Sequence, residues 1–564
     1  MRTWVKTYLV VALCMIGAGI IYLSLPLGQE EENKADMSNG IRQEAEGIDE
    51  LGERDLEYAV DEIEIAQPDA PKLYRLENGR LETSAGYFEV AQEAQWYWGE
   101  TLVEGSKARF LGQALTLTQD DTGLVTQIQV LSPSDAPSRI RILLQAGDGA
   151  VSSETDIEAL KADYIYETVT IRCEEAFWGI WDGSVKAYTP GTAVTIDGLA
   201  QRAVFCPVQS DTPLVLQAGD QTQSYYGQLE VGVEEGGYSV VNEVNIEKYL
   251  MGVVPSEMPG SYGEEAAKVQ AVCARSYAYS QWFAGEKFLS LGAHVDDSTR
   301  SQVYGGVVDY EASIQGVEAT WGQVLTYQGS LISANYFSTS CGYTANGHEV
   351  WAGHTELPYQ MGQPQYEEGD YGDLSQEENF HAFITNGDVA AYDSESPWFR
   401  WQASIDLAKL QDNVDAYFAL PKEVKEVQGE ELIEAEINGI GQVQDIYVYE
   451  RSQTGMAISL LLMGSERSVV LEGPLKIREL LGGLDVTMAN GEQSGERVLL
   501  PSAFISLEKI NDTEENLVSV TICGGGYGHG VGMSQNGVKG MIEAGYTYDQ
   551  ILQHFYPGTE LVNF

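Results

Sequence analysis

The pattern of apolar and polar residues divides the chain into a β-rich first part and a more helical second part. Short segments of alternating polarity, bounded by Asp, Gly and Pro, recur between Pro71 and Asn245 and are typical of strands. The clearest of them are residues 109–118, 124–131, 138–144, 168–173, 228–233 and 238–241. At Asn245 the period changes to that of a helix. We therefore predict an α+β fold that is β-rich before Asn245, followed by a mixed α/β core with helices around a groove.

One carboxylate lies between two prolines at the start of the helical part. Asn245 is a good N-cap, and residues 246–251 can make two helical turns before Pro255 ends them. Pro255 and Pro259 both restrict the backbone, so Glu257 is expected in a stiff connection rather than inside a helix. Reactive groups often lie in such connections, although a solvated loop glutamate would give the same pattern.

A second helix is expected after Pro259. Its first turn contains Glu264 and Glu265, whose charge complements the helix dipole. Spacings of three and four then indicate a buried face formed by Val269, Val272, Cys273, Ser276 and Ser280. The residues expected on the open side are Gln270, Arg275 and Tyr279.

A glycine-rich segment at residues 524–537 follows a predicted strand at residues 517–523. Glycines allow a backbone to approach another backbone or a ligand closely. Neither a dinucleotide fingerprint nor a P-loop fits, because no complete βαβ unit and no Gly-Lys-Ser/Thr sequence follows. His529 within this segment is either a structural histidine or part of a site. Thr547 is expected to cap a last helix that ends at Phe555.

Composition and charge narrow the classes of function. Hydrophobic residues make up 43% of the 564 residues, which is enough for globular domains. The 32 Lys and Arg residues against 85 Asp and Glu residues give a formal charge of −53, which argues against nucleic acid as a partner. The cysteines have no C-x-x-C spacing and signal neither a disulfide framework nor a zinc knuckle. They are Cys14, Cys173, Cys206, Cys273, Cys341 and Cys523.

The N-terminal residues predict a membrane anchor. Arg2 and Lys6 precede an apolar stretch at residues 8–27, which is long enough to span a bilayer with the N-terminus in the cytoplasm. A cleavable signal peptide is the alternative, but no clear cleavage site precedes the acidic residues that follow. The predicted organisation is an anchor at 1–28, an acidic flexible tether at 29–70, a small accessory β unit at 71–137, and one large domain at 138–564.

Several motifs stand out within residues 138–564. They are Tyr249-Leu-Met-Gly-Val-Val-Pro-Ser-Glu-Met-Pro, Glu265-Ala-Ala-Lys-Val-Gln-Ala-Val-Cys-Ala-Arg-Ser-Tyr-Ala, Ser301-Gln-Val-Tyr-Gly-Gly, Ser338-Thr-Ser-Cys-Gly-Tyr-Thr, Ser396-Pro-Trp-Phe-Arg-Trp and Gly526-Tyr-Gly-His-Gly-Val-Gly-Met-Ser-Gln. Their order and spacing closely resemble the stage II sporulation protein D and amidase-enhancer LytB family. The catalytic motif of the family corresponds to residues 249–283 and its glycine-rich motif to residues 524–537.

The resemblance implies a lytic transglycosylase that cleaves the glycan strands of peptidoglycan, in spore formers during engulfment of the forespore. Glu257 matches the catalytic acid. Its carboxyl group would protonate the glycosidic oxygen and then take the proton of the 6-hydroxyl of the same muramic sugar, leaving a 1,6-anhydro end. One acid suffices because the nucleophile is part of the substrate. An apolar wall, with Met251, Met258 and Tyr304 as candidates, is expected to raise the pKa of Glu257.

Other residues of the motifs are candidates to line a glycan groove, since polar side chains and aromatic faces suit sugars. They are Arg275, Gln302, Tyr304, Ser338, His529, Ser534 and Gln535.

The chain departs from the family pattern at Cys341, where small residues are usual, and at Asn536, where tyrosine is more typical. Because some relatives hold zinc near this region, zinc at Cys341, His348 and His354 is an alternative. The spacing matches no strong ligand pattern, and Phe337 occupies a position where a histidine would have helped. We therefore expect no metal and no other cofactor.

The expected partners are peptidoglycan glycan strands, the membrane through the N-terminal helix, and a cell-wall amidase or other engulfment proteins. The protein is expected to be a single-pass membrane protein with its bulk outside the cytoplasm. A non-catalytic enhancer of an amidase is the main alternative function, and a vegetative wall-remodelling enzyme is a third.

Overall fold

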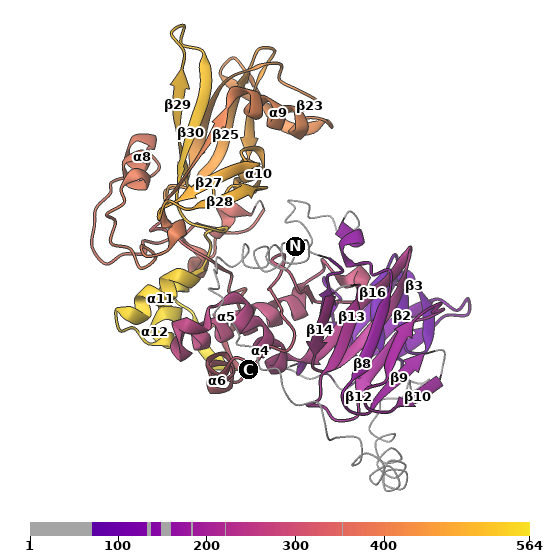
Figure 1. The fold of residues 1–564 in the computed structure, drawn as a ribbon. Helices are drawn as coiled ribbons and strands as arrows, with labels where there is room; N and C mark the ends of the chain where they lie inside the picture. Colours follow the sequence, from indigo (N-terminus) through magenta and orange to yellow (C-terminus); the bar gives the residue numbers. More distant parts are fainter. Residues whose placement is uncertain are drawn as a thin grey trace, which may run out of the picture.

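The computed structural model describes residues 70–131, 133, 137–147, 160–181, 184–219, 221–351 and 353–564. The predicted anchor and nearly all of the predicted tether lie outside the described residues. Within the part of the chain that is described, no helix is long and apolar enough to cross a membrane. The predicted mixture of helices and sheets, β-rich in the N-terminal part, is confirmed (Figure 1).

The accessory β unit contains one sheet in the order β1-β2-β3-β6-β5, with β4 paired to β3. Its strands are β1 (Leu73–Glu77), β2 (Arg80–Thr83), β3 (Gly86–Trp98), β4 (Thr101–Leu102), β5 (Thr116–Gln119) and β6 (Val125–Val130). The prediction of a strand over residues 109–118 was wrong for its first half. Residues 108–110 form a 3-10 helix instead, because the backbone N–H groups of Phe110 and Leu111 bond to carbonyls three residues earlier and not to a neighbouring strand.

The next part of the chain forms two sheets that enclose a hydrophobic core. One has the order β10-β9-β12-β15-β16-β7-β17 and the other the order β11-β8-β13-β14. Their strands are β7 (Arg139–Leu144), β8 (Val169–Cys173), β9 (Phe177–Trp181), β10 (Ser184–Tyr188), β11 (Ala193–Ile196), β12 (Ala203–Pro207), β13 (Leu214–Ala218), β14 (Gln221–Tyr225), β15 (Gln228–Glu234), β16 (Gly237–Asn245) and β17 (Val295–Asp296). The strands predicted between residues 138 and 241 are therefore present.

A helical layer follows the sheets. The Asn245 side chain accepts the backbone N–H of Glu247 at 2.9 Å and so begins α4 (Ile246–Glu257), as predicted. Helices α5 (Glu264–Ala284) and α6 (Glu311–Ala319) pack against it. The C-terminal segment returns to this layer, where α11 (Gln535–Glu543) and α12 (Tyr548–Phe555) pack against α5 (Figure 1). Strand β32 (Glu560–Asn563) pairs with β18 (Gln323–Tyr327), which also pairs with β19 (Ser330–Leu331). The predicted cap of the last helix at Thr547 is present.

The part of the sequence between β19 and α11 forms a second lobe (Figure 1). The hydrophobic pattern of the sequence did not predict this lobe as a separate unit. The second lobe contains two five-stranded sheets with a common core. Their strands are β21 (Trp401–Asp406), β22 (Lys422–Gln428), β23 (Glu431–Ile437), β24 (Val443–Arg451), β25 (Ala457–Gly464), β26 (Ser468–Glu472), β27 (Leu484–Met488), β28 (Gln493–Arg497), β29 (Ile505–Asn511) and β30 (Leu517–Gly524). Its helices are α8 (Glu377–Thr385), α9 (Leu407–Tyr417) and α10 (Pro474–Leu480).

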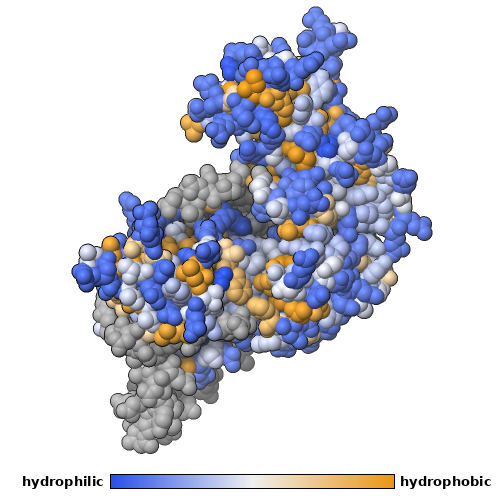
Figure 2. Space-filling model, turned by 180° about the vertical axis from the view of Figure 1, so that it is seen from behind, coloured by the Kyte–Doolittle hydropathy of each residue, from blue (hydrophilic) through white to orange (hydrophobic). Residues whose placement is uncertain are grey.

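The surface of the molecule is largely hydrophilic on the face seen from behind (Figure 2), in keeping with the excess of Asp and Glu over Lys and Arg.

Helix α4 and the segment at residues 304–306 approach each other so closely that only glycine fits at the contact. A Cβ atom at Gly252 would lie 2.3 Å from the carbonyl oxygen of Gly306 and 2.6 Å from the ring of Tyr304.

We predict that Gly252→Ala lowers the free energy of unfolding by about 1–3 kcal/mol, because the added methyl group must displace the backbone of residues 304–306. Urea denaturation measures the change. Gly387→Ala is the matched control, since its Cβ atom would meet nothing within 4 Å. Equal effects of the two substitutions would contradict the prediction.

Candidate functional site

Glu257 is the last residue of α4, and Pro255 lies inside the same helix. The prediction that Pro255 ends the helix and leaves Glu257 in a stiff connection was therefore wrong. A proline removes only its own N–H donor, and the backbone N–H of Met258 still bonds to the carbonyl of Val254 at 2.9 Å. The helix thus continues past Pro255 and fixes the position of Glu257 more firmly than a loop would.

The Glu257 carboxyl group is enclosed by segments that are far apart in the sequence. Glu257 is only 8% exposed. Its Oε1 accepts the backbone N–H of Val303 at 2.7 Å, and its Oε2 accepts the side-chain amide of Gln535 at 3.3 Å. Gln535 is the first residue of α11, so the glycine-rich C-terminal motif reaches the carboxylate as the sequence motifs suggest.

Burial raises the pKa of Glu257 to about 6, and hydrogen bonds with Val303, Gln535 and Tyr336 oppose the rise. No neighbouring charge contributes to the shift. The predicted rise in this pKa agrees in direction, and its cause is burial. The wall formed by Met251, Met258 and Tyr304 stays a prediction. A carboxyl group with this pKa can donate a proton and take one back in the same pH range.

Tyr336 was not selected from the sequence, yet its hydroxyl group belongs to the site. It lies in β20 (Tyr336–Phe337), which pairs in parallel with β31 (Met533–Ser534). Its hydroxyl oxygen accepts the amide of Gln302 at 3.1 Å, and Gln302 in turn accepts the hydroxyl of Tyr249 at 3.1 Å. Because the amide can only donate, the hydroxyl proton of Tyr336 is free to point toward Glu257.

Gln302 was predicted to line a groove, but it is fully buried in this chain of hydrogen bonds. Its Nε2 also donates to the carbonyl of Ala274 at 3.4 Å. The side chain therefore links Tyr336, which bonds to Glu257, to Tyr249. Gln302 thus orders the side chains around Glu257 but is not itself exposed at the surface.

Arg275 and Tyr304 were also expected in a groove, and the structure places both in the interior. The guanidinium group of Arg275 forms a bidentate ion pair with Glu247, at 2.8 and 2.6 Å, that joins α5 to α4. Tyr304 donates its hydroxyl to Asn242 at 3.1 Å. The other two residues expected on the open side of α5, Gln270 and Tyr279, are buried as well. The expectation of an open face failed because α4 and α6 cover that side of α5.

Ser338 and Ser534 hold the start of α11 rather than line a surface. Ser534 is the N-cap of α11 and accepts the backbone N–H of Gly537 at 3.2 Å. It also donates to the buried carboxylate of Asp393, a residue that the sequence analysis did not select. The carbonyl of Ser338 accepts the backbone N–H of Asn536 at 2.9 Å. Burial raises the pKa of Asp393 to about 6. These bonds set the direction in which Gln535 extends.

His529 is half-buried and lies within an aromatic group. Its ring is 5.3 Å from that of Trp351 and 5.7 Å from that of Phe337, measured between ring centroids. Its Nδ1 accepts the backbone N–H of Val531 at 3.1 Å. Burial lowers the pKa of His529 to about 4, so the ring is neutral at physiological pH. The ring also forms a hydrogen bond with the backbone of Tyr336, so His529 is a neutral, internally bonded ring and offers no positive charge.

The three residues considered for zinc do not converge. Cys341 is buried, with its thiol directed at the carbonyl of Tyr343, whereas His348 is half-buried and His354 is exposed. Among the described residues, no group of three or more His, Cys, Asp or Glu side chains could hold a metal ion. These three side chains therefore do not fit a zinc centre.

Comparison with known protein families finds a match over the residues around Glu257. Residues 234–327, which contain Glu257, match the family described as Stage II sporulation protein. Residues 345–532, which include the second lobe, match a domain of unknown function. The resemblance predicted from the motifs is thereby confirmed.

Individual relatives agree with this family match. The chain is 30% identical to the amidase enhancer of Bacillus subtilis (strain 168) over 332 residues, which are 56% of this chain and 40% of that protein. It is 27% identical to the stage II sporulation protein D of the same organism over 338 residues, covering 57% of this chain and 75% of the relative. The stage II sporulation protein D of Bacillus amyloliquefaciens is 27% identical over 334 residues. The match thus spans well under half of the amidase enhancer and three quarters of the sporulation proteins.

The raised pKa of Glu257 predicts a pH-dependent stability difference between the wild type and Glu257→Gln. Below the ordinary pKa of 4.5 the carboxyl group is protonated in the folded and the unfolded chain. As the pH rises, the unfolded chain ionises first, so the wild type loses stability relative to Glu257→Gln until the pH passes about 6. The total change should be about 2 kcal/mol.

Urea denaturation of both proteins at pH 4 and pH 8 measures this change. Glu318→Gln, at an exposed position of α6, is the control and should show no comparable trend. A stability difference for Glu257→Gln that is the same at both pH values would show that the carboxyl group is not perturbed in the folded state.

Proposed function

Because residues 234–327 match the family described as Stage II sporulation protein, we propose that the protein is a lytic transglycosylase acting on the glycan strands of peptidoglycan. The observation that carries the proposal is the buried carboxyl group of Glu257 within the residues that match the family. Its pKa is raised to about 6 by burial, and no charged neighbour contributes to the shift. This combination suits one group that acts as acid and then as base.

In the proposed reaction, Glu257 donates its proton to the oxygen of the glycosidic bond as the bond to C1 of the muramic sugar breaks. The 6-hydroxyl oxygen of that sugar forms a new bond to C1, and the Glu257 carboxylate takes the hydroxyl proton. The products are a 1,6-anhydro sugar and a free hydroxyl on the other fragment, and the acid is regenerated. A hydrolase would need a second carboxylate to activate water or to form a covalent intermediate.

The neighbours of Glu257 have positioning roles in this proposal. The backbone N–H of Val303 and the amide of Gln535 each bind one oxygen of the carboxyl group. Since both are donors, they stabilise the ionised form and keep the pKa from rising further. The raised pKa is therefore a balance between burial and hydrogen bonding, which suits a group that must ionise during the reaction.

The proposed setting is the septal cell wall during engulfment of the forespore. This setting follows from the sporulation relatives, and the predicted N-terminal anchor would keep the domain at the outer face of the cell membrane. The large negative charge is compatible with a glycan substrate and unfavourable for a nucleic acid.

A second function is favoured by one observation, the relative that is named an amidase enhancer. In that case the protein would stimulate a cell-wall amidase without cleaving glycan itself. The second lobe, which matches a domain of unknown function, would be the candidate contact region for such a partner. The two functions predict different products from the same incubation.

The proposed activity is tested by incubating the purified full-length protein with glycan strands, with and without stem peptides, and analysing the products by mass spectrometry. We expect 1,6-anhydro-muramic ends from the wild type. Glu257→Gln should lower the rate by about 100-fold or more, because the acid and base are both lost. Glu318→Gln should retain wild-type activity.

Equal rates for the wild type and Glu257→Gln would rule out the assigned role of Glu257. Products with reducing ends would indicate hydrolysis. If no glycan is cleaved but an added amidase releases peptides faster, the enhancer function is supported in place of the transglycosylase.

A further inference from the structure

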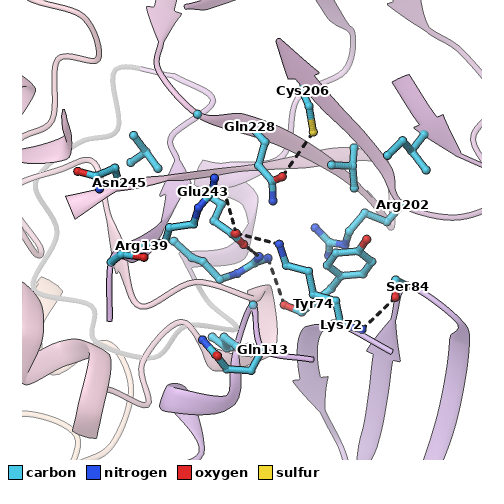
Figure 3. Close-up of a pocket in the computed structure, with 18 of the residues that line it drawn as sticks. Lys72, Tyr74, Ser84, Gln113, Arg139, Arg202, Cys206, Gln228, Glu243 and Asn245 are labelled. Atoms are coloured by element: carbon cyan, nitrogen blue, oxygen red, sulfur yellow. Dashed lines mark hydrogen bonds and ion pairs between the residues drawn. The ribbon is translucent and has the colours of Figure 1, made fainter. Parts of the chain in front are cut away.

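A cavity of about 1150 Å³ lies between the accessory β unit and the seven-stranded sheet (Figure 3). Its charges are balanced within the wall, because each Lys and Arg side chain that lines it lies within 3.6 Å of an acidic side chain. The pairs are Lys72, Arg139 and Arg141 with Glu243, Arg202 with Glu82, and Lys248 with Asp211. The cations of this cavity are therefore neutralised by the protein itself.

Two arginines of the second lobe differ, because they have no acidic side chain within ion-pair distance among the described residues. Arg478 lies in the last turn of α10, and its Nε donates to the carbonyl of Leu500 at 2.8 Å. Arg497 is the last residue of β28, and its Nη1 donates to the hydroxyl oxygen of Tyr527 at 3.3 Å. In a chain with a formal charge of −53, such a pair is a local exception.

Tyr527 brings the two guanidinium groups together. Burial raises the pKa of Tyr527, and the charges of Arg497 and Arg478 oppose the rise. The phenol is therefore neutral at physiological pH and does not neutralise either arginine.

The ring of Trp398 supports Arg497 from another side. The guanidinium carbon of Arg497 lies 4.8 Å from the centroid of this ring, which is a cation–π distance. The same ring lies 4.9 Å from that of Tyr527. Trp398 belongs to the motif at residues 396–401, which has no part in the proposed proton transfer. The motif thus holds an arginine in place.

Three guanidinium nitrogens of the pair are open to a ligand. Nη1 and Nη2 of Arg478 and Nη2 of Arg497 have no hydrogen-bond partner among the described residues, and none of the three is an enclosed atom. Nε of Arg497, by contrast, is enclosed. Arg478 is half-buried, so its two terminal nitrogens have a fixed direction. Two parallel N–H groups of this kind match the two oxygens of a carboxylate.

The acidic residues next to the two arginines in the sequence do not occupy these nitrogens. Glu479 and Glu496 are both exposed and form no ion pair with Arg478 or Arg497 in the described part of the chain. Successive residues of a strand point to opposite faces, so Glu496 of β28 points away from Arg497. The pair therefore remains available to an external anion.

The arginine pair lies close to the carboxyl group of Glu257. Tyr336, whose hydroxyl group bonds to Glu257, begins β20. Thr339, three residues later, exchanges two backbone hydrogen bonds with Tyr527, at 3.1 and 2.8 Å. Three residues span at most about 11 Å, which a short oligosaccharide can bridge. Burial and the charge of Arg478 also lower the pKa of His529, so the guanidinium group lies near that ring too.

We propose that Arg478 and Arg497 form a carboxylate subsite for the glycan strand that reaches Glu257. Arg478 binds the carboxylate through Nη1 and Nη2, and Arg497 binds it through Nη2. The choice of peptidoglycan as the ligand rests on the proposed function. A peptidoglycan strand offers a carboxylate from either of two sources, the lactyl ether of an unsubstituted muramic sugar or the stem peptide of a substituted one. The second lobe would then contribute to substrate selection.

Isothermal titration calorimetry with full-length Glu257→Gln tests the proposal, because this variant should leave the strand uncleaved. The probes are three tetrasaccharides of alternating N-acetylglucosamine and N-acetylmuramic acid. Their lactyl groups are free acids, methylamides, or amides of the dipeptide L-Ala-D-Glu. We expect a carboxylated probe to bind at least about tenfold more tightly than the methylamide, as charge-assisted hydrogen bonds predict. Preference for the free acid identifies the lactyl carboxylate as the source, and preference for the dipeptide identifies the stem peptide.

Substitutions in the Glu257→Gln background assign this preference to the arginines. Arg478→Gln should abolish it and leave the affinity for the methylamide unchanged, which also shows that the variant is folded. Arg478→Lys keeps the charge but not the two parallel donors, so it should retain only part of the preference. Arg497→Gln should weaken it. Lys476→Gln, at an exposed position of the same helix, is the matched control and should keep it.

Equal affinity for the three probes, an unchanged preference in Arg478→Gln, or an equal loss for all probes in that variant would each overturn the proposal. Tighter binding of glycerol 3-phosphate than of any tetrasaccharide, lost in Arg478→Gln, would identify a phosphate site and also overturn it. No heat with any tetrasaccharide would contradict the glycan ligand, and with it the proposed function. A carboxylate preference that depends on Arg478, without 1,6-anhydro products from the wild type, would overturn the proposed function alone.

Discussion

The burial of one carboxyl group, where the end of α4 meets the start of α11, is the constraint on which the candidate site depends. Glu257 can be enclosed only because α4 continues through Pro255 and because Gly252 lets the helix approach residues 304–306. The C-terminal part must then return across the molecule so that Gln535 can reach the carboxylate. The second lobe lies between α4 and α11 in the sequence, yet Gln535 of α11 still reaches Glu257 of α4.

Several charged groups of the described core are held in ion pairs, whereas Glu257 and Asp393 have only hydrogen-bond donors as partners. Arg275 is neutralised by Glu247, and Arg141 by Glu230 and Glu243, so these groups join elements together. An ion pair would favour the ionised form of a carboxyl group and lower its pKa. Glu257 has only hydrogen-bond donors as partners, and burial prevails. Asp393 has a similarly raised pKa, but it binds Ser340 and Ser534 at the start of α11, so the family motif and not the pKa alone singles out Glu257.

Local signals in the sequence predicted the elements that local chemistry determines. The cap at Asn245, the helix after Pro259 and the strands before residue 245 all follow from capping and periodicity, and the structure contains them. Contacts between distant segments were not accessible in this way. The burial of Arg275 depends on α4 and α6 covering α5, and Tyr336 reaches Glu257 through a strand pairing that no spacing reveals. The second lobe gave no signal as a separate unit, because its alternating strands resemble those of any sheet.

The most direct test of the account is the pH dependence of kcat/KM for the formation of 1,6-anhydro products. The free protein should lose activity as the pH rises past about 6, because Glu257 must be protonated to act as the acid. Removing the hydroxyl group with Tyr336→Phe should move this loss to higher pH, since that hydroxyl favours the ionised form. A rate that stays constant or rises between pH 6 and 8, with no shift in Tyr336→Phe, would contradict the central role of the buried carboxyl group.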